Sequence, residues 1–178
     1  MVKYLSIDIE TGGLDPKEYS LLEVAMVYYN SDEPNSLYKH ISHHIKEDVY
    51  RISQYCLEMH TNNHLLETLA KNAVLYAHQA ESLFINFIEE HTKDEKFIVI
   101  GKNFGAFDYQ WLKIYMPNLA KKLGYRFLDI GSLFLTSQDM EIPNSDECLK
   151  RAGRKHSINH TALSDAIDIM DLALFKLN

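Results

Sequence analysis

The chain has few of the residues that mark secreted, membrane-spanning or multidomain proteins. Its only two cysteines, Cys56 and Cys148, form no C-x-x-C pair, so we expect two reduced thiols and neither a disulfide nor a zinc site. Four prolines and seven glycines form no linker and no repeat is visible, which predicts one domain over residues 1–178. No apolar run approaches membrane-spanning length and no secretory signal opens the chain, so we expect a cytoplasmic protein without a membrane partner.

Positive charge is scarce as well. Lys and Arg number 18 against 25 Asp and Glu, and this net charge of -7 argues against a broad basic face that coats nucleic acid. A nuclease is not excluded, because catalytic carboxylates add to the negative total and bound divalent ions would offset several of them. Two basic clusters are candidates for phosphate binding or are simply solvated surface. They are Lys150, Arg151, Arg154 and Lys155, and Lys121, Lys122 and Arg126.

What the sequence does contain is an ordinary globular share of hydrophobic residues, 46%, in strand-like and helix-like patterns. The predicted strands are 3–10, 21–29, 37–44, 97–101 and 125–131, and the predicted helical stretches are 53–92, 105–116, 146–153 and 161–177. Three strands joined by short loops, followed by alternating helices and strands, predict an α/β layer fold. We expect a mixed five-stranded central sheet, three antiparallel strands and then two parallel ones, flanked by helices.

Two acidic residues stand inside the first predicted strand, in "LSIDIETGGLD". Successive side chains of a strand alternate, so Asp8 and Glu10 share one face while Ile7 and Ile9 share the other. Two like charges beside a core are costly unless a cation compensates them, and a divalent metal is the obvious candidate. A D-x-E by itself also fits a strand end whose acids face solvent, so the rest of a site must be found elsewhere.

Further acids occur at the starts of two predicted helices. Asp108 stands early in the helix after the fourth strand, where the helix dipole also favours an acid without catalysis. In the terminal helix Asp165 falls on the border of the apolar face, whereas Asp168 and Asp171 are expected to point progressively outward. His160 precedes Asp165 by five positions. Taken alone, this segment is better explained by a histidine near the helix cap and a surface aspartate.

Taken in order, D-x-E on the first strand, F-D after the fourth and H-x-x-x-x-D at the terminal helix resemble the DEDDh 3′-to-5′ exonucleases, which include polymerase proofreading domains, RNase T and oligoribonuclease. The local contexts are "DIETGGLDP", "NFGAFDYQWL" and "HTALSDA", and the resemblance covers essentially the full chain. It implies an RNase H-like fold. The catalytic residues that it implies are Asp8, Glu10, Asp108, His160 and Asp165.

The resemblance also implies the chemistry. Asp8, Glu10, Asp108 and Asp165 would hold two divalent metal ions, Mg²⁺ or Mn²⁺, which prefer oxygen ligands and stabilise the attacking and leaving oxygens at phosphorus. His160 would serve as general base, since histidine titrates near neutral pH. The residues implied to bind substrate are Thr11, Gly12, Gly13 and Leu14 at the 3′-terminal nucleotide, and Asn103 near the second motif. Tyr109 is a further candidate, because aromatic rings stack on bases, although it could equally pack into the core.

Two sets of features favour different substrates within this family. Asn103, the Tyr-Met-Pro-x-Leu run at 115–119 and the Tyr-Arg-x-x-Asp run at 125–129 are similar to oligoribonuclease, which would imply very short RNA and a homodimer. Tyr109 and Gln110 stand where oligoribonucleases usually have arginines, and "DIETGG" is nearer the proofreading enzymes. Glu23 either matches an acid common in the family or is a buried, hydrogen-bonded carboxylate.

We therefore expect a 3′-to-5′ exonuclease that acts on single-stranded DNA or RNA, or on short oligonucleotides, and releases nucleoside 5′-monophosphates. An oligoribonuclease restricted to very short RNA is the alternative within the family. The alternatives from other classes are a non-catalytic nucleic-acid-binding or adaptor module with the same fold and a metal-dependent phosphoesterase for a small molecule.

Overall fold

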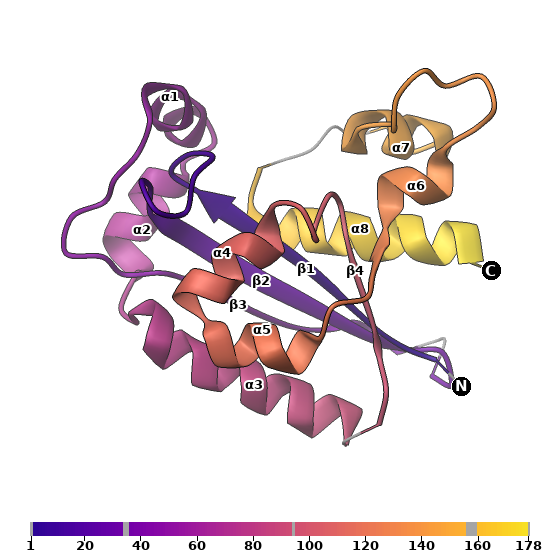
Figure 1. The fold of residues 1–178 in the computed structure, drawn as a ribbon, viewed down its shortest axis with the longest axis horizontal. Helices are drawn as coiled ribbons and strands as arrows, with labels where there is room; N and C mark the ends of the chain where they lie inside the picture. The colour runs from indigo at the N-terminus through magenta and orange to yellow at the C-terminus, as the bar shows by residue number, and fades with distance from the viewer. Residues whose placement is uncertain (1, 34–35, 94, 156–159, 178) are drawn as a thin grey trace.

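A five-stranded sheet forms the centre of the computed structural model, which describes residues 2–33, 36–93, 95–155 and 160–177. The strands are β1 (Lys3–Thr11), β2 (Leu21–Asn30), β3 (Lys39–His44), β4 (Ile98–Gly101) and β5 (Phe127–Asp129). They lie in the order β3-β2-β1-β4-β5 (Figure 1). β2 is antiparallel to β1 and β3, whereas β4 is parallel to β1 and β5. The predicted mixed sheet is confirmed.

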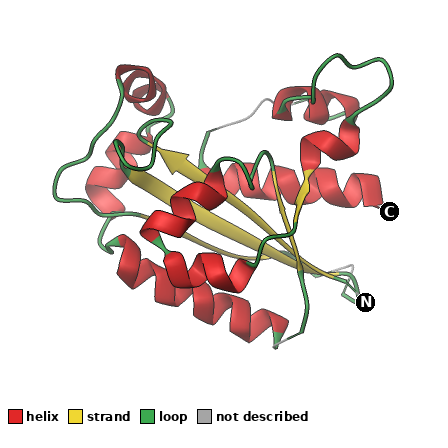
Figure 2. Cartoon of the chain, in the orientation of Figure 1, coloured by secondary structure: helices red, strands yellow, loops and turns green. Residues whose placement is uncertain are grey.

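Helices cover both faces of this sheet (Figure 2). They are α1 (Gln54–Asn62), α2 (Leu65–Asn72), α3 (Ala77–Thr92), α4 (Asp108–Tyr115), α5 (Pro117–Leu123), α6 (Ile130–Phe134), α7 (Ser145–Arg151) and α8 (Ala162–Leu177). Helices α3, α4 and α5 share a core with Leu5 and Ile7 of β1, whereas α6, α7 and α8 share another with Ala25 and Val27 of β2. The sheet is therefore the middle of three layers, which is the predicted α/β arrangement.

Several element boundaries differ from the prediction. The helical stretch 53–92 is three helices, and the helix expected from 105 begins at Asp108, because the chain first turns through Asn103 at φ 56°. Pro117 starts a separate helix, a first-turn position that suits a residue without a backbone N–H. The fifth strand ends at Asp129, whose side chain accepts a hydrogen bond from the backbone N–H of Ser132 and so begins α6.

The terminal helix is buried over a wider arc than its apolar stripe indicated. Asp165 is buried at the border of the stripe, but Asp168 is only 8% exposed, so the prediction that it points outward is wrong. The reason is that α8 contacts β1, β2, β3 and β4, and the sheet covers more of its circumference than one stripe. Asp171 is half-buried and accepts a hydrogen bond from the Tyr38 hydroxyl.

The two cysteines agree with what the sequence indicated. Cys56 and Cys148 are both buried and are free thiols, which confirms the expectation that they form no disulfide. Among the described residues, no helix has the combined length and apolar character needed to cross a membrane.

Candidate active site

Asp8 and Glu10 lie on the face of β1 that carries α8. Ser6, two residues before Asp8 on the same face, donates a hydrogen bond of 2.6 Å from Oγ to the carbonyl oxygen of Ala166 in α8. Ile9, between the two acids, belongs to the core on the opposite face. Because side chains alternate along a strand, both carboxylates project toward the first turn of α8.

Glu23 of β2 holds the start of that helix. It lies directly opposite Glu10 in the β1–β2 register, is 3% exposed, and its Oε2 accepts a hydrogen bond of 3.0 Å from the backbone nitrogen of Ala162. Of its two interpretations, the buried and hydrogen-bonded carboxylate is confirmed. The contact sets the position of Asp165, which lies in the first turn of α8.

All five motif residues line one cavity of about 330 Å³, which we call the carboxylate cavity. They are Asp8, Glu10, Asp108, His160 and Asp165. Asp108 enters it as the first residue of α4 and is only 5% exposed. Single ligand atoms of Glu10, His160 and Asp165 lie within 4.8 Å of one another. The structure thus brings together residues that are up to 157 positions apart, from Asp8 to Asp165.

The acids of the carboxylate cavity have strongly perturbed protonation. Burial raises the pKa of Asp8 well above its ordinary value, and the charges of Asp108, Glu10, Asp165 and Glu23 raise it further. Burial is also the main cause of the raised pKa of Glu10, followed by Asp165, Glu23 and Asp108. The pKa of Asp108 rises to about 7 through burial, although hydrogen bonds to its own backbone N–H and to that of Ile9 oppose the rise. Such a cluster of acids is ionised together only when cations compensate it.

His160 reaches the cavity from an unusual backbone conformation. It is exposed and has φ 51°, in the left-handed region that few residues other than glycine adopt. The side chain of Asn63, at the end of α1, donates a hydrogen bond of 2.6 Å from Nδ2 to the carbonyl oxygen of His160. Asn63 is a site residue that sequence reasoning missed, because nothing in the pattern of α1 indicates a contact 97 positions away.

A second missed residue is His60 of α1, which is fully buried behind Glu10. Its Nε2 lies 3.0 Å from the carbonyl oxygen of Thr11 and 3.9 Å from Oε2 of Glu10. Burial lowers the pKa of His60, and this effect outweighs the hydrogen bond to Thr11, which raises the pKa. The lowered pKa favours the neutral imidazole, and because a carbonyl only accepts, the contact with Thr11 favours the tautomer that is protonated at Nε2. His60 supports the end of β1 immediately beside the carboxylate cavity.

A larger cavity of about 580 Å³ adjoins the carboxylate cavity and shares Ile9, Glu10 and Phe107 with it. We call it the Leu14 cavity, because the Leu14 side chain on its wall is 84% exposed. Tyr55 of α1, 76% exposed, also lines it. Sequence reasoning missed Tyr55, since an isolated exposed aromatic residue in a helix carries no signal of its own.

Gly12 and Gly13, the pair predicted to bind substrate, differ in their structural roles. Thr11, Gly13 and Leu14 line the Leu14 cavity, whereas Gly12 is not among its lining residues. A Cβ at Gly12 would lie 2.3 Å from the carbonyl oxygen of Arg51, so only glycine permits this close approach of two backbone segments. The hydrogen bond from the Ser53 backbone N–H to the Gly12 carbonyl joins the same segments. Gly12 thereby holds the loop that presents its neighbours.

Asn103 and Tyr109, expected around the second motif, lie outside both of these cavities. Asn103 lines a neighbouring cavity of about 410 Å³, and its backbone N–H donates to Oδ2 of Asp129. The Tyr109 hydroxyl donates to the Ala120 carbonyl oxygen, and its ring packs 4.8 Å, between centroids, from that of Phe127. The geometry gives Tyr109 a packing role against Phe127.

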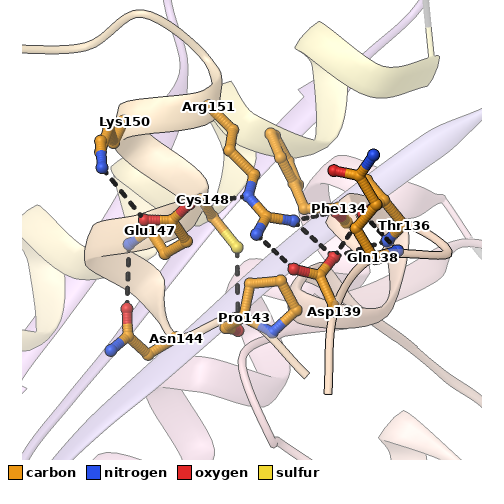
Figure 3. A network of polar contacts seen from close by, with 10 residues as sticks. All are labelled: Phe134, Thr136, Gln138, Asp139, Pro143, Asn144, Glu147, Cys148, Lys150 and Arg151. Carbon is orange, nitrogen blue, oxygen red and sulfur yellow. Dashed lines mark hydrogen bonds and ion pairs between the residues drawn. The ribbon is translucent and has the colours of Figure 1, made fainter. Parts of the chain in front are cut away.

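Most of the basic side chains at 150–155 form ion pairs within the protein. Figure 3 shows the Arg151 guanidinium bound by both oxygens of Asp139 and by Glu147, and Arg151 Nη1 also donates to the Phe134 carbonyl oxygen. Lys150 lies 3.7 Å from Glu147, and Arg154 pairs with Asp171. This network anchors α7, and Ser145 and Asp146 from its first turn line the carboxylate cavity.

Comparison with known proteins agrees with this geometry. A family model described as an exonuclease, RNase_T, matches residues 5–173. The oligoribonuclease of Haemophilus ducreyi is 30% identical over 172 residues, which cover 89% of this chain and 84% of that protein. The oligoribonuclease of Pasteurella multocida is 26% identical over 181 residues, covering 96% and 90%.

Solved structures show the same fold. The nuclease domain of 3′hExo, a DEDDh family member bound to rAMP, matches with a TM-score of 0.70 at 16% identity and covers 98% of this chain and 91% of that one. The Escherichia coli exonuclease I complex with single-stranded DNA matches with a TM-score of 0.69 at 19% identity, covering 99% and 40%.

The match to the family model and the meeting of three sequence motifs in one cavity point to the same family. One concerns the whole chain and the other the placement of five side chains. Together they show that the chain belongs to the exonuclease family and is a 3′-to-5′ exonuclease of the DEDDh type.

Proposed function

We propose that Asp8, Glu10, Asp108 and Asp165 hold two divalent ions, Mg²⁺ or Mn²⁺, in the carboxylate cavity. The observation that carries this proposal is the convergence of four acids with His160 in one space of about 330 Å³. The raised pKa values of Asp8, Glu10 and Asp108 fit it, because these groups repel one another until a cation neutralises them. Carboxylate oxygens are the ligands that both ions prefer.

The residues in and beside the carboxylate cavity have different roles in phosphodiester hydrolysis. When bound, the two ions supply electrostatic stabilisation of the oxygens that enter and leave phosphorus. The imidazole of His160, exposed at the mouth of the cavity, accepts a proton from the attacking water. Glu23 and Ser6 keep α8 in place against the sheet, so that Asp165 stays opposite Asp8 and Glu10. The products are nucleoside 5′-monophosphates.

The Leu14 cavity is the proposed site of the 3′-terminal nucleotide. It adjoins the carboxylates, and its walls include the exposed side chains of Leu14 and Tyr55, which offer apolar and aromatic surfaces to a base. Thr11 and Gly13 line the same space. Solved structures of similar fold hold rAMP or single-stranded DNA, which supports a single-stranded substrate for this chain.

The experiment that tests the proposed function uses 5′-labelled strands of five and thirty nucleotides, in DNA and in RNA, with Mg²⁺ or Mn²⁺. We expect a ladder that shortens from the 3′ end, loss of the ladder in Asp8→Asn, and its loss when the ions are chelated. Intact strands with the wild-type protein would contradict the proposal and favour a binding module or a small-molecule phosphoesterase. Full activity of Asp8→Asn would remove the carboxylate cavity from the mechanism.

A further inference from the structure

The loop at residues 13–19, which we call the Leu14 loop, connects β1 to β2 and forms one wall of the Leu14 cavity. The backbone N–H of Gly12 donates a hydrogen bond of 2.8 Å to the carbonyl oxygen of Ser20, which closes the base of this loop. The Leu14 side chain is 84% exposed, so its own packing does little to fix where it lies. The position of Leu14 therefore depends on contacts that the rest of the loop makes with the protein.

Tyr19 connects Leu14 to the body of the protein. A Cβ at Gly13 would lie 2.3 Å from the Tyr19 ring, so the backbone next to Leu14 rests directly on this ring. The Tyr19 side chain is half-buried and packs against the core that α3, α4 and α5 share with the sheet. Both Gly13 and Tyr19 line the Leu14 cavity. A displacement of Tyr19 would therefore move the wall that carries Leu14.

The last residue of α4, Tyr115, binds the backbone of Tyr19. Its hydroxyl donates a hydrogen bond of 2.6 Å to the Tyr19 carbonyl oxygen. Its ring is stacked on that of Trp111, a fully buried residue of the same helix, with 5.8 Å between the centroids. Burial raises the pKa of Tyr115, so the hydroxyl keeps the proton that it donates. Because α4 begins at Asp108, it contacts the carboxylate cavity with its first residue and the Leu14 loop with its last.

Arg51, from the segment between β3 and α1, contacts both Tyr115 and the Leu14 loop. Its Nη2 donates a hydrogen bond of 3.2 Å to the Tyr115 hydroxyl oxygen, and its Nη1 donates one of 3.0 Å to the carbonyl oxygen of Lys17. The Arg51 carbonyl oxygen also accepts a hydrogen bond of 3.0 Å from the backbone N–H of Ser20, at the base of the loop. One guanidinium therefore links the end of α4 to the middle of the Leu14 loop.

We propose that Tyr115 and Arg51 are positioning residues, which hold the Leu14 loop in the conformation that binds the 3′-terminal nucleotide. Neither is a lining residue of the Leu14 cavity or the carboxylate cavity, so they act through the loop and touch neither nucleotide nor metal. A loop that is ordered before binding saves the entropy that ordering it on the nucleotide would cost. Loss of these contacts weakens nucleotide binding and leaves the metal ligands in place. This inference rests on the proposed function, which assigns the terminal nucleotide to the Leu14 cavity.

Steady-state kinetics of Tyr115→Phe and Arg51→Met test the proposal on a five-nucleotide strand. Tyr115→Phe keeps the ring on Trp111, and Arg51→Met keeps the backbone hydrogen bond with Ser20. We expect KM to rise by about threefold to tenfold in each variant, the worth of one hydrogen bond, while kcat stays within about twofold. A lower kcat with an unchanged KM would overturn the proposal, because it would place the effect in the chemical step.

Two further variants provide matched controls. Tyr76→Phe removes a tyrosine hydroxyl that donates a hydrogen bond of 2.7 Å to Asp48, and Tyr76 lines neither cavity. Lys113→Met removes an exposed positive charge from α4, the helix that carries Tyr115. We expect both controls to keep the KM of the wild type. An equal rise of KM in the controls would overturn the proposal, because loss of any hydroxyl or surface charge would then have the same effect.

Calorimetric binding separates the nucleotide from the ions without turnover. Mn²⁺ alone is titrated first, and a nucleoside 5′-monophosphate is then titrated in saturating Mn²⁺. In Tyr115→Phe and Arg51→Met, we expect the nucleotide affinity to fall by about threefold to tenfold and the Mn²⁺ affinity to stay within about twofold. The double variant should lose less than the product of the two single losses, because both substitutions remove the bond between Arg51 and the Tyr115 hydroxyl.

Two results of this titration would overturn the proposal. Unchanged nucleotide affinity would show that the loop does not need these contacts, and equal losses of nucleotide and Mn²⁺ affinity would show general damage to the fold. A wild-type protein that binds neither Mn²⁺ nor the nucleotide would instead overturn the proposed function.

Hydrogen exchange reports on the Leu14 loop directly. In the nucleotide-free protein, we expect the backbone amides of residues 13–19 to exchange faster in Tyr115→Phe and Arg51→Met than in the wild type, since the loop has lost contacts that keep it closed. Exchange in Tyr76→Phe should match the wild type over these residues. Wild-type exchange rates in both loop variants would overturn the proposal.

Discussion

Glu23 Oε2 accepts a hydrogen bond of 3.0 Å from the backbone nitrogen of Ala162, which ties the second strand to the first residue of the terminal helix. The bond crosses 139 positions of sequence and lies beside the carboxylate cavity. Glu23 adds to the negative charge that raises the pKa values of Asp8 and Glu10. The charge of Glu23 therefore adds to the electrostatic repulsion among the neighbouring acids. Its hydrogen bond nevertheless anchors the helix that carries Asp165.

Glu23→Ala should destabilise the protein and lower its activity together. Removal of the acceptor leaves a buried N–H of α8 without a partner, which costs about 1–3 kcal/mol. We expect a matching decrease in the free energy of unfolding in urea and a lower kcat. Glu23→Gln, which keeps an oxygen acceptor for Ala162, should lose less of both. If Glu23→Ala retained wild-type stability, the bond would not anchor α8.

Asp108→Asn should make the stability of the metal-free protein less dependent on pH. The pKa of Asp108 rises from its ordinary value of 3.8 to about 7 in the folded state. The unfolded chain therefore loses this proton first as pH rises, so the folded protein is destabilised progressively between about pH 4 and pH 7 and is favoured below this range. In EDTA, we expect the melting temperature of the wild type to fall across this range.

The same titration in Asp108→Asn, where the side chain stays neutral, should show a smaller fall. Saturating Mg²⁺ should stabilise the wild type at neutral pH more than it stabilises the variant, because the bound ion removes the penalty of ionised carboxylates. The opposite result would be an Asp108→Asn variant that melts below the wild type at neutral pH in EDTA and whose melting temperature depends as steeply on pH. That result would contradict the repulsion among these acids.

Asn63→Ala should lower kcat without loss of folding. Asn63 Nδ2 donates to the carbonyl oxygen of His160, whose left-handed backbone needs such support. A small displacement of His160 should reduce kcat by about tenfold to a hundredfold with little change in KM. The melting temperature should fall slightly, because Asn63 Oδ1 also accepts a hydrogen bond of 3.1 Å from the Leu65 backbone N–H. Asn62→Ala is the matched control, because Asn62 is exposed on the same helix. A raised KM with an unchanged kcat would show that Asn63 acts on substrate binding instead.

Arg151→Met should destabilise the protein at neutral pH more than in acid. Its hydrogen bonds hold the pKa of Asp139 well below its ordinary value, and they also lower the pKa of Glu147. A carboxyl with a lowered pKa contributes stability above its ordinary pKa, and this contribution is lost as pH falls through the folded pKa. The difference in melting temperature between Arg151→Met and the wild type should shrink below about pH 4.

Lys150→Met provides the control for Arg151. Lys150 is an exposed neighbour that lies 3.7 Å from the same Glu147. We expect Lys150→Met to change the melting temperature little at any pH, because exposed ion pairs contribute little to stability. An equal effect of both variants would show that general surface charge, and not the bonds from Arg151 to Asp139 and Glu147 in Figure 3, accounts for the result.

The sequence predicts which four carboxylates meet in one cavity, because Asp8 and Glu10 stand near the end of a patterned strand and the other two acids stand at helix starts. Asp8 and Glu10 alternate with core isoleucines, and Asp165 borders an apolar stripe, so each is visible in a periodic pattern. His60 and Asn63 belong to no such pattern. Their roles depend on tertiary contacts with Glu10, Thr11 and His160, which only the folded chain brings near.

The same reason explains why the sequence left the role of the basic cluster at 150–155 open and why it misplaced Asp168. Arg151 looked like a surface cation because its partner Asp139 stands in a loop without a motif. Asp168 looked exposed because a helical stripe does not show how much of a helix the sheet covers. The homodimer, the single domain over residues 1–178 and the cytoplasmic location stay predictions, since each depends on more than the contacts within one chain.

A crystal structure of the protein with Mn²⁺ and a nucleoside 5′-monophosphate tests the central claim most directly. Manganese is identified by its anomalous signal, without reference to activity. We predict two ions in the carboxylate cavity, with oxygen ligands from Asp8, Glu10, Asp108 and Asp165, and a nucleotide whose base lies between Leu14 and Tyr55. Ions bound elsewhere, or a nucleotide outside the Leu14 cavity, would contradict the account.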